Sequence, residues 1–282
     1  SFIFGVSPPS IKPLQFFILM SQLSRLSKGL LSATTLNLSR SVFSIVPAFA
    51  ASNSLFTPVY FRNYNNASKL VHRKMSTSSE IPKNNKVIVI RENGGPEVLR
   101  YEEDFPISAL NDDEILINNK YAGINFIEAY FRNGLYPCEK PYVLGREASG
   151  VVASVGQKVK DFSVGDKVAY LSAGTFAEYT KINPNVNKII KLADDSTDEQ
   201  LKLYGSSLVQ GLTTLTFVNE AYNVQPNDYI LVHSAAGGCG LLFTQLITKL
   251  KHANVIATAS TDAKLDLAKS YGAQYLINSK TD

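Results

Sequence analysis

The chain has no tryptophan, and its 282 residues include only two cysteines, two methionines and three histidines. Cys138 and Cys239 stand far apart, and His72, His233 and His252 form no cluster with them. The spacing therefore excludes a recognisable zinc site or disulfide framework, and such scarcity is typical of a reducing compartment. No apolar stretch runs for about 18 residues without a break, so we expect no membrane-spanning helix.

Acidic residues are missing from the first 79 positions, which hold eight of the chain's 28 basic residues. The rest of the chain therefore carries 20 basic and 24 acidic residues, a net charge of −4. The overall charge of +4 belongs to this leader. A slightly acidic body argues against a nucleic-acid-binding surface spread over it.

Residues 1–79 are rich in Ser, Leu, Asn and Arg, which is the composition of a mitochondrial transit peptide. We predict a disordered leader over 1–79 and, if it is translated, a mitochondrial protein. Two alternatives stay open. A secretory signal could be cleaved after Ala48-Phe49-Ala50, or translation could start at Met75 and give a cytosolic (cytoplasmic) protein.

From Lys86 onward the sequence changes to short apolar segments, such as KVIVI and EILINNKYAGI, with turn signals roughly every ten residues. This pattern predicts a small β-barrel, which we place at 80–205. After Lys191, the strand-like segments DYILV, NVIATA and YLIN alternate with helical ones. The β-α-β-α-β alternation predicts a parallel sheet with right-handed crossovers, which we place at 206–282.

A glycine-rich stretch, HSAAGGCG at 233–240, joins the first of these later strands to the next helix. It departs from the dinucleotide fingerprint G-x-G-x-x-G only at the first position, where Ala235 stands. Gly237 would let the backbone approach a pyrophosphate, and Gly240 would let the helix pack against the strand. We predict a dinucleotide site here; the alternative is a tight turn without a ligand.

The end of the second strand indicates which dinucleotide would bind. An NAD enzyme places an acid about 20 residues after the turn, but Ser260 stands there, and Asp262 falls at the start of the next helix. Ser260 or Thr261 can cap that helix, and Lys264 follows one turn later. Hydroxyls with a following lysine suit a 2′-phosphate, so we favour NADPH, although an exposed helix lysine would give the same pattern.

Several stretches, running in order from roughly residue 86 to residue 278, resemble one family. They are GGPEVLRYEE (94–103), AGINFIEAYFRNGLYP (122–137), VLGREASGVVASVG (143–156), VGDKVAY (164–170), GTFAEY (174–179), VQGLTTL (209–215), VHSAAGGCG (232–240) and ASTDAK (259–264). The chain resembles the quinone oxidoreductase (zeta-crystallin-like) branch of the zinc-free medium-chain dehydrogenase/reductases, and fungal members most closely. The resemblance implies an α/β protein: a GroES-like β-barrel, then a Rossmann-type doubly wound parallel sheet, here C-terminally incomplete, with NADPH between them.

The resemblance also implies roles for single residues. Asn125, Phe126 and Tyr130 would line the nicotinamide, and Tyr136 would lie near the quinone. The other cofactor contacts would come from Thr213, Thr216, Gly237, Gly238, Cys239, Ser260, Lys264 and Ser279. Cys239 stands where the family usually has valine, Ser279 where it often has tyrosine, and Thr216 where it has an aromatic residue.

Zinc alcohol dehydrogenases carry Gly-His-Glu where this chain has Gly145-Arg146-Glu147, and a cysteine ligand near Asn125. We therefore predict no metal site, which disfavours alcohol oxidation.

Together these features predict a zinc-independent NADPH:quinone oxidoreductase that works mainly by placing the nicotinamide next to its acceptor. Asn125, Tyr130 and Tyr136 are the candidate catalytic residues, the tyrosines as donors to a quinone oxygen. The alternatives are an alkenal or enone reductase of the same superfamily, or a non-catalytic protein that binds AU-rich RNA. We expect a homodimer at full length. Because a dinucleotide fold needs about six strands and the sequence stops after the third, we expect a fragment that is unstable or inactive alone.

Overall fold

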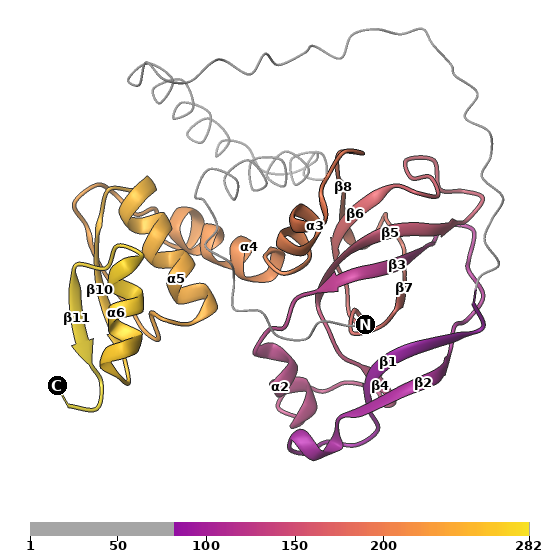
Figure 1. Ribbon diagram of the computed structural model, residues 1–282, viewed down its shortest axis with the longest axis horizontal. Helices are drawn as coiled ribbons and strands as arrows, with labels where there is room; N and C mark the ends of the chain where they lie inside the picture. Colours follow the sequence, from indigo (N-terminus) through magenta and orange to yellow (C-terminus); the bar gives the residue numbers. More distant parts are fainter. Residues whose placement is uncertain (1–81, 282) are drawn as a thin grey trace, which may run out of the picture. The chain divides into compact units, whose positions relative to one another are not determined.

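The computed structural model describes residues 82–281 (Figure 1). The predicted leader, 1–79, lies outside the described residues, so its nature and the compartment of the protein stay predictions. No helix within 82–281 has the length and apolar character needed to cross a membrane.

The first part of the described chain is built from two antiparallel sheets. One sheet has the order β2-β1-β4, with strands β1 (Asn84–Ile90), β2 (Arg100–Pro106) and β4 (Tyr142–Val143). The other has the order β7-β3-β5-β6-β8, with strands β3 (Ile115–Ala122), β5 (Glu147–Val155), β6 (Lys167–Leu171), β7 (Tyr179–Ile182) and β8 (Lys188–Lys191). Two short helices, η1 (Pro96–Val98) and α2 (Ile127–Arg132), lie between the strands. The short strands predicted from the sequence are confirmed.

Alternation along these strands creates the core of the larger sheet. Ile115 and Ile117 of β3 point to the same side, two residues apart, and pack with Val152 of β5 and Val168 of β6. All four side chains are at most 1% exposed. Burial of this apolar surface is the main force that stabilises the sheet.

A polar network lies inside this apolar core. The fully buried Tyr170 hydroxyl of β6 donates to Asn119 Oδ1 of β3 at 2.6 Å. Asn119 Nδ2 in turn donates to Thr180 Oγ1 of β7 at 2.8 Å and to the Ala177 carbonyl at 2.9 Å. Each of these buried polar groups thereby has a partner, so the network fixes three strands against one another without an unsatisfied atom at Asn119.

Tyr170→Phe is expected to lower the free energy of unfolding by about 1–3 kcal/mol, because Asn119 Oδ1 would stay buried without a donor. Tyr204→Phe is the matched control, since that half-buried hydroxyl has no hydrogen-bond partner among the described residues. Urea unfolding of the two variants measures the difference. Equal losses of stability would contradict a role for the network.

The second part of the described chain begins with the helices α3 (Asp198–Gly205) and α4 (Leu208–Thr216), followed by the π-helical turn η2 (Phe217–Ala221). Strand and helix then alternate through β9 (Tyr229–Val232), α5 (Gly238–Gln245), η3 (Leu246–Leu250), β10 (Asn254–Ala259), α6 (Asp262–Ser270) and β11 (Tyr275–Asn278). The three strands are parallel, in the order β11-β10-β9 (Figure 1). The predicted β-α-β-α-β order is confirmed, and the helix that follows β9 continues from α5 into the π-helical segment η3. The domain boundaries stay a prediction.

The parallel sheet is covered unevenly. Val255 and Ala257 of β10 are fully buried and pack with Ala268 of α6 and Ile247 of η3. Apolar side chains at alternate positions of the outer strands are exposed instead, namely Tyr229, Leu231, Tyr275 and Ile277.

Candidate cofactor site

The glycine-rich turn between β9 and α5 is fixed by its own backbone. Gly237 N donates to the Ser234 carbonyl at 2.8 Å, and Ala235 N donates to the Thr258 carbonyl of β10 at 3.0 Å. Ser234 takes the left-handed conformation, with φ of +51°. Ala235 is fully buried, and its methyl group packs in the core under the sheet. The left-handed residue therefore precedes Ala235, which explains why alanine is accommodated at the first fingerprint position.

The two remaining fingerprint glycines differ in what surrounds them. A Cβ atom on Gly240 would lie 2.4 Å from the Ser234 carbonyl oxygen and 2.7 Å from the Ala235 backbone, so only glycine fits. A Cβ atom on Gly237 would meet only the Ser234 oxygen, at 3.2 Å, and the backbone φ of −78° suits any residue. The packing of the protein thus requires Gly240, whereas nothing in the described chain requires Gly237. A ligand that approaches the backbone would require it.

Helix α5 starts at this turn without a side-chain cap. Its N-cap is Gly237, and no side chain accepts a hydrogen bond from its first turn. The helices α3 and α6, in contrast, are capped by the hydroxyls of Thr197 and Thr261. The first N–H groups of α5 are therefore available to an anion, and the helix dipole favours one there.

The structure brings the residues predicted to bind the 2′-phosphate together at the carboxyl ends of β10 and β11. Lys264 Nζ lies 3.4 Å from Ser260 Oγ. Ser279 N and Oγ both donate to the Ala259 carbonyl, at 2.9 and 3.3 Å. Thr261 caps α6 by accepting from Lys264 N, and Asp262 accepts from Asn278 Nδ2 at 2.8 Å.

The residues predicted to line the nicotinamide and the quinone lie on α2 and just beside it. The rings of Phe126 and Tyr130 are 5.4 Å apart, and those of Tyr130 and Tyr136 are 5.3 Å apart, each pair edge to face. Phe126 is 77% exposed and Tyr136 is 41% exposed. Neither tyrosine hydroxyl has a hydrogen-bond partner within 82–281, so both remain available as donors.

Asn125 differs from these aromatic residues because it is buried. Its Nδ2 donates to Glu147 Oε1 at 2.7 Å, and its Oδ1 accepts from Gln210 Nε2 at 3.4 Å. The α4 residues Thr213 and Thr216 are exposed, and the Thr213 hydroxyl donates back to the Val209 carbonyl at 2.7 Å. That hydroxyl can still accept a hydrogen bond from a ligand.

Comparison with known proteins agrees with this arrangement. The alcohol dehydrogenase GroES-like domain family matches residues 111–194. A Schizosaccharomyces pombe protein named "Probable quinone oxidoreductase" is 42% identical over 194 residues, which are 67% of this chain and 56% of the relative. The structure of Escherichia coli quinone oxidoreductase complexed with NADPH aligns with a TM-score of 0.64 at 34% identity, covering 70% of this chain and 59% of that one. The chain belongs to the quinone oxidoreductase branch of the medium-chain dehydrogenase/reductases.

Family membership confirms the predicted fold class, a GroES-like β-barrel followed by a Rossmann-type parallel sheet. The chain spans less than two thirds of the length of these relatives. A 2-haloacrylate reductase of a Burkholderia species is also 33% identical over 199 residues, 68% of this chain and 58% of the relative. The relatives therefore include a reductase named for a different acceptor.

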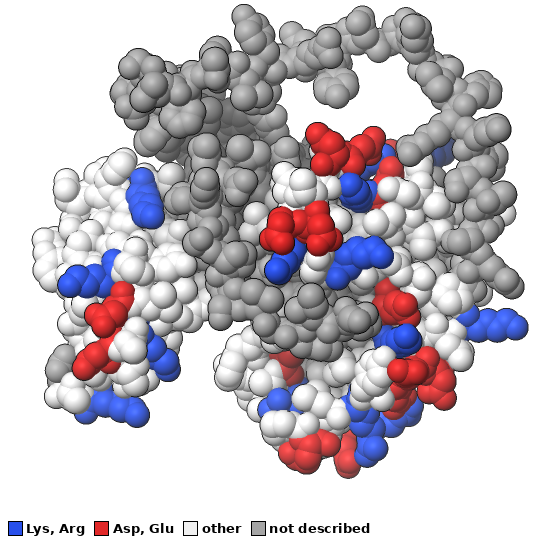
Figure 2. Space-filling view, in the orientation of Figure 1, with Lys and Arg blue, Asp and Glu red and all other residues white. Residues whose placement is uncertain are grey.

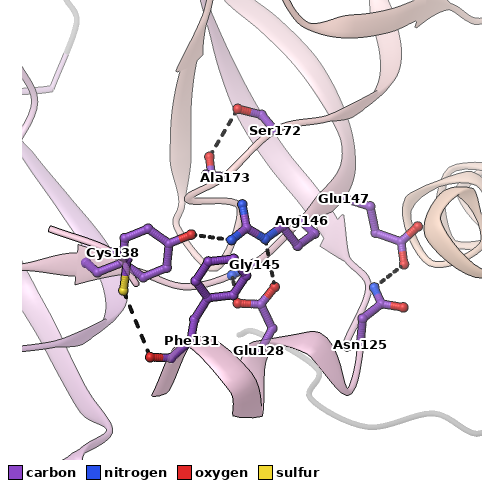
Figure 3. Close-up of polar contacts among 10 residues, drawn as sticks. Asn125, Glu128, Phe131, Cys138, Gly145, Arg146, Glu147, Ser172 and Ala173 are labelled. Atoms are coloured by element: carbon purple, nitrogen blue, oxygen red, sulfur yellow. Dashed lines mark hydrogen bonds and ion pairs between the residues drawn. The ribbon is translucent and has the colours of Figure 1, made fainter. Parts of the chain in front are cut away.

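Arg146 stands where zinc alcohol dehydrogenases have a histidine, and it is held on several sides (Figure 3). Its Nε lies 3.5 Å from Glu128 Oε1, one of its Nη atoms donates to the Tyr142 hydroxyl at 2.5 Å, and its guanidinium lies 3.9 Å above the Phe131 ring. Glu128 Oε2 also accepts from Gly145 N at 2.9 Å. Burial raises the pKa of the Glu128 carboxyl, while the Gly145 amide and the Arg146 charge act in the opposite direction.

No group of three or more His, Cys, Asp and Glu side chains within 82–281 is arranged to hold a metal ion. His233 is exposed, and its Nδ1 lies 3.1 Å from Thr258 Oγ1.

Cys239 is half-buried in the first turn of α5. Burial raises the pKa of its thiol, and the nearby Glu147 carboxylate adds to this effect.

Sequence reasoning did not single out three residues that shape this candidate site: Ser234, Glu147 and Gln210. The available signal was Glu147, an acid at the start of the otherwise apolar segment EASGVV. Among the described residues on the face shown in Figure 2, Lys and Arg lie beside Asp and Glu, and they form no continuous basic strip of the kind that RNA binding needs.

Proposed function

We propose that this protein binds NADPH at the 234–240 turn and uses it to reduce quinones. The observation that carries the proposal is the unneeded glycine, Gly237, at the uncapped start of α5. A bare backbone and free N–H groups at one point are what a pyrophosphate requires. The E. coli relative has been solved as an NADPH complex, which supports the same cofactor here.

In this proposal the chain contributes mainly binding and orientation. The amides of Gly238 and Cys239 hold the pyrophosphate beside the bare backbone of Gly237, and Ser260 and Lys264 hold the 2′-phosphate. NADPH supplies the reducing equivalents when bound. The Asn125 amide orients the nicotinamide end, while the Tyr130 and Tyr136 hydroxyls donate to a quinone oxygen and the exposed Phe126 ring shields it from water.

Assays of NADPH oxidation by the full-length protein, with 1,2-naphthoquinone and with 2-alkenals, test the acceptor. We expect turnover with the quinone to exceed turnover with the alkenals. Because a 2-haloacrylate reductase is among the relatives, preference for the alkenal would instead establish the enone reductase alternative. If neither acceptor supports NADPH oxidation, both the quinone reductase proposal and the enone reductase alternative are refuted.

Lys264→Ala is expected to weaken NADPH binding by about tenfold or more, because one charge-assisted hydrogen bond to the 2′-phosphate would be lost. Binding of NADH, which lacks that phosphate, should change little. Lys269→Ala, at the far end of the same helix, is the matched control. Fluorescence titrations of the unmodified protein and of both variants, each with NADPH and with NADH, give the dissociation constants. Equal losses of affinity for NADPH and NADH in Lys264→Ala would contradict the assignment.

We also propose that the reaction is independent of zinc, since the stacked Arg146–Glu128 ion pair fills the position of a metal-binding histidine. Dialysis against a chelator is expected to leave quinone turnover unchanged, and added Zn²⁺ should not increase it. Turnover that falls on dialysis and returns with Zn²⁺ would overturn this assignment.

A further inference from the structure

The carboxylate of Glu147 is fully buried where β5 meets α4. Its Oε1 accepts from Asn125 Nδ2 at 2.7 Å, and its Oε2 accepts from Val209 N, in the first turn of α4, at 2.8 Å. The Ser207 side chain, at the N-cap of α4, does not cap the helix. Glu147 therefore acts as the cap of α4 from another element, and it holds Asn125 at the same time.

Gly123 leaves room for this carboxylate, because glycine has no side chain. A Cβ atom on Gly123 would lie 2.1 Å from Glu147 Oε1, so any larger residue there would push the carboxylate away from Asn125. Both oxygens of Glu147 accept, and no described side chain offers an acceptor for a proton on it. Burial raises the pKa of the Glu147 carboxyl, while the Asn125 amide and the backbone amides at the start of α4 act in the opposite direction by favouring the charged form. The hydrogen-bond contacts are those of a carboxylate.

A carboxylate that only accepts determines the orientation of every amide behind it. Asn125 must turn its NH₂ group toward Glu147, which leaves Oδ1 to accept from Gln210 Nε2. The Gln210 oxygen then lies over Gly238, where a Cβ atom would be only 2.1 Å from it. The order of donors and acceptors is thus fixed from Glu147 to Gln210, whose oxygen lies against the first residue of α5.

We propose that Glu147 is a positioning residue for the dinucleotide site, which fixes the orientation of the Asn125 and Gln210 amides against the 237–239 turn. The inference rests on the proposed NADPH function and deepens it. Glu147 touches neither cofactor nor acceptor in this scheme and acts only through Asn125, Gln210 and the start of α4.

Glu147→Gln tests the inference because glutamine keeps the shape but can donate through its own NH₂ group. When its oxygen accepts from Val209 N, its NH₂ group faces Asn125 and forces that amide to turn over. We expect kcat with quinone to fall about tenfold to hundredfold, as for a misplaced reacting group, while KM for NADPH changes less than threefold. Asp166→Asn is the matched control, a buried barrel carboxylate that accepts from Ser163 N and pairs with Lys191.

A charge swap separates orientation from simple loss of packing. Asn125→Asp alone places two carboxylates together and should lower kcat at least as much as Glu147→Gln. In the double variant, the new glutamine donates to the new carboxylate at position 125, and that carboxylate still accepts from Gln210, so at least a third of the lost kcat should return. A double variant no better than the single Asn125 variant, or a Glu147→Gln enzyme with the kcat of Asp166→Asn, would overturn the inference.

One measurement needs neither NADPH nor quinone. In a Cys138→Ser background, the rate of Cys239 alkylation is measured over a range of pH. The midpoint of this pH profile gives the pKa of the Cys239 thiol. Glu147→Gln should move the midpoint to lower pH, because the carboxylate that opposes ionisation is gone, while Asp166→Asn should not. An unmoved midpoint would contradict the placement of the Glu147 charge beside the turn. Absence of quinone turnover in the unmodified protein, with the midpoint moved, would refute the proposed function alone.

Discussion

Gly240→Ala is expected to destabilise the chain by about 3 kcal/mol, whereas Gly237→Ala, three residues earlier, should leave stability almost unchanged. A methyl group on Gly240 would lie 2.4 Å from the Ser234 oxygen and 2.7 Å from Ala235 Cα. These are backbone atoms of a turn tied to β10, and no side-chain rotation can move them. Gly240 lies inside α5, where alanine ordinarily gains about 1 kcal/mol over glycine, so the steric cost must exceed that gain.

Gly237→Ala is expected to separate folding from binding. The new methyl group would meet only one atom, at 3.2 Å, so we expect a change of less than about 0.5 kcal/mol in the free energy of unfolding. It would stand between the backbone and the pyrophosphate, and NADPH should bind at least tenfold more weakly. Urea unfolding and fluorescence titration measure the two effects. Full NADPH affinity in Gly237→Ala would support the alternative of a tight turn without a ligand.

The sequence predicted the order of strands and helices well because that order follows from local patterns. The alternation along β3 and each turn signal are contained within a few neighbouring residues. The dinucleotide turn was also predicted, but the reason for Ala235 was not. That reason is the left-handed conformation of Ser234, directly before the hydrogen bond that Ala235 N makes to the Thr258 carbonyl of β10.

The polar groups behind the site could not be predicted in this way. Glu147 contacts Asn125 across 22 positions of sequence and Val209 across 62, so these contacts exist only after the sheets and helices have packed. Arg146 illustrates the same limit. The sequence excluded a histidine ligand at this position, yet only the fold shows that Glu128 and two aromatic rings hold the arginine in its place.

Breaking that ion pair is the second change with a large expected effect. The side chains of Glu128 and Arg146 are 8% and 23% exposed, and Glu128 also accepts from the amide of Gly145, whose φ is +103°. Glu128→Ala would leave a nearly buried guanidinium without its partner and the Gly145 amide without its acceptor. We expect the free energy of unfolding to fall by about 3–5 kcal/mol.

Glu128→Gln is the matched control, since it keeps an acceptor for Gly145 N and removes only the charge, and its loss of stability should be clearly smaller. The free energy of unfolding of the unmodified protein and that of Glu128→Gln should also depend differently on pH. Because burial raises the pKa of Glu128, the folded state holds its proton more tightly than the unfolded state. That contribution to stability is complete below the ordinary glutamate value, is lost as pH rises through the raised pKa, and is missing from Glu128→Gln. Urea unfolding of the unmodified protein and of Glu128→Gln across this range measures it. Stability of the unmodified protein that instead rises with pH relative to Glu128→Gln would show that the ion pair, rather than burial, determines the ionisation of Glu128.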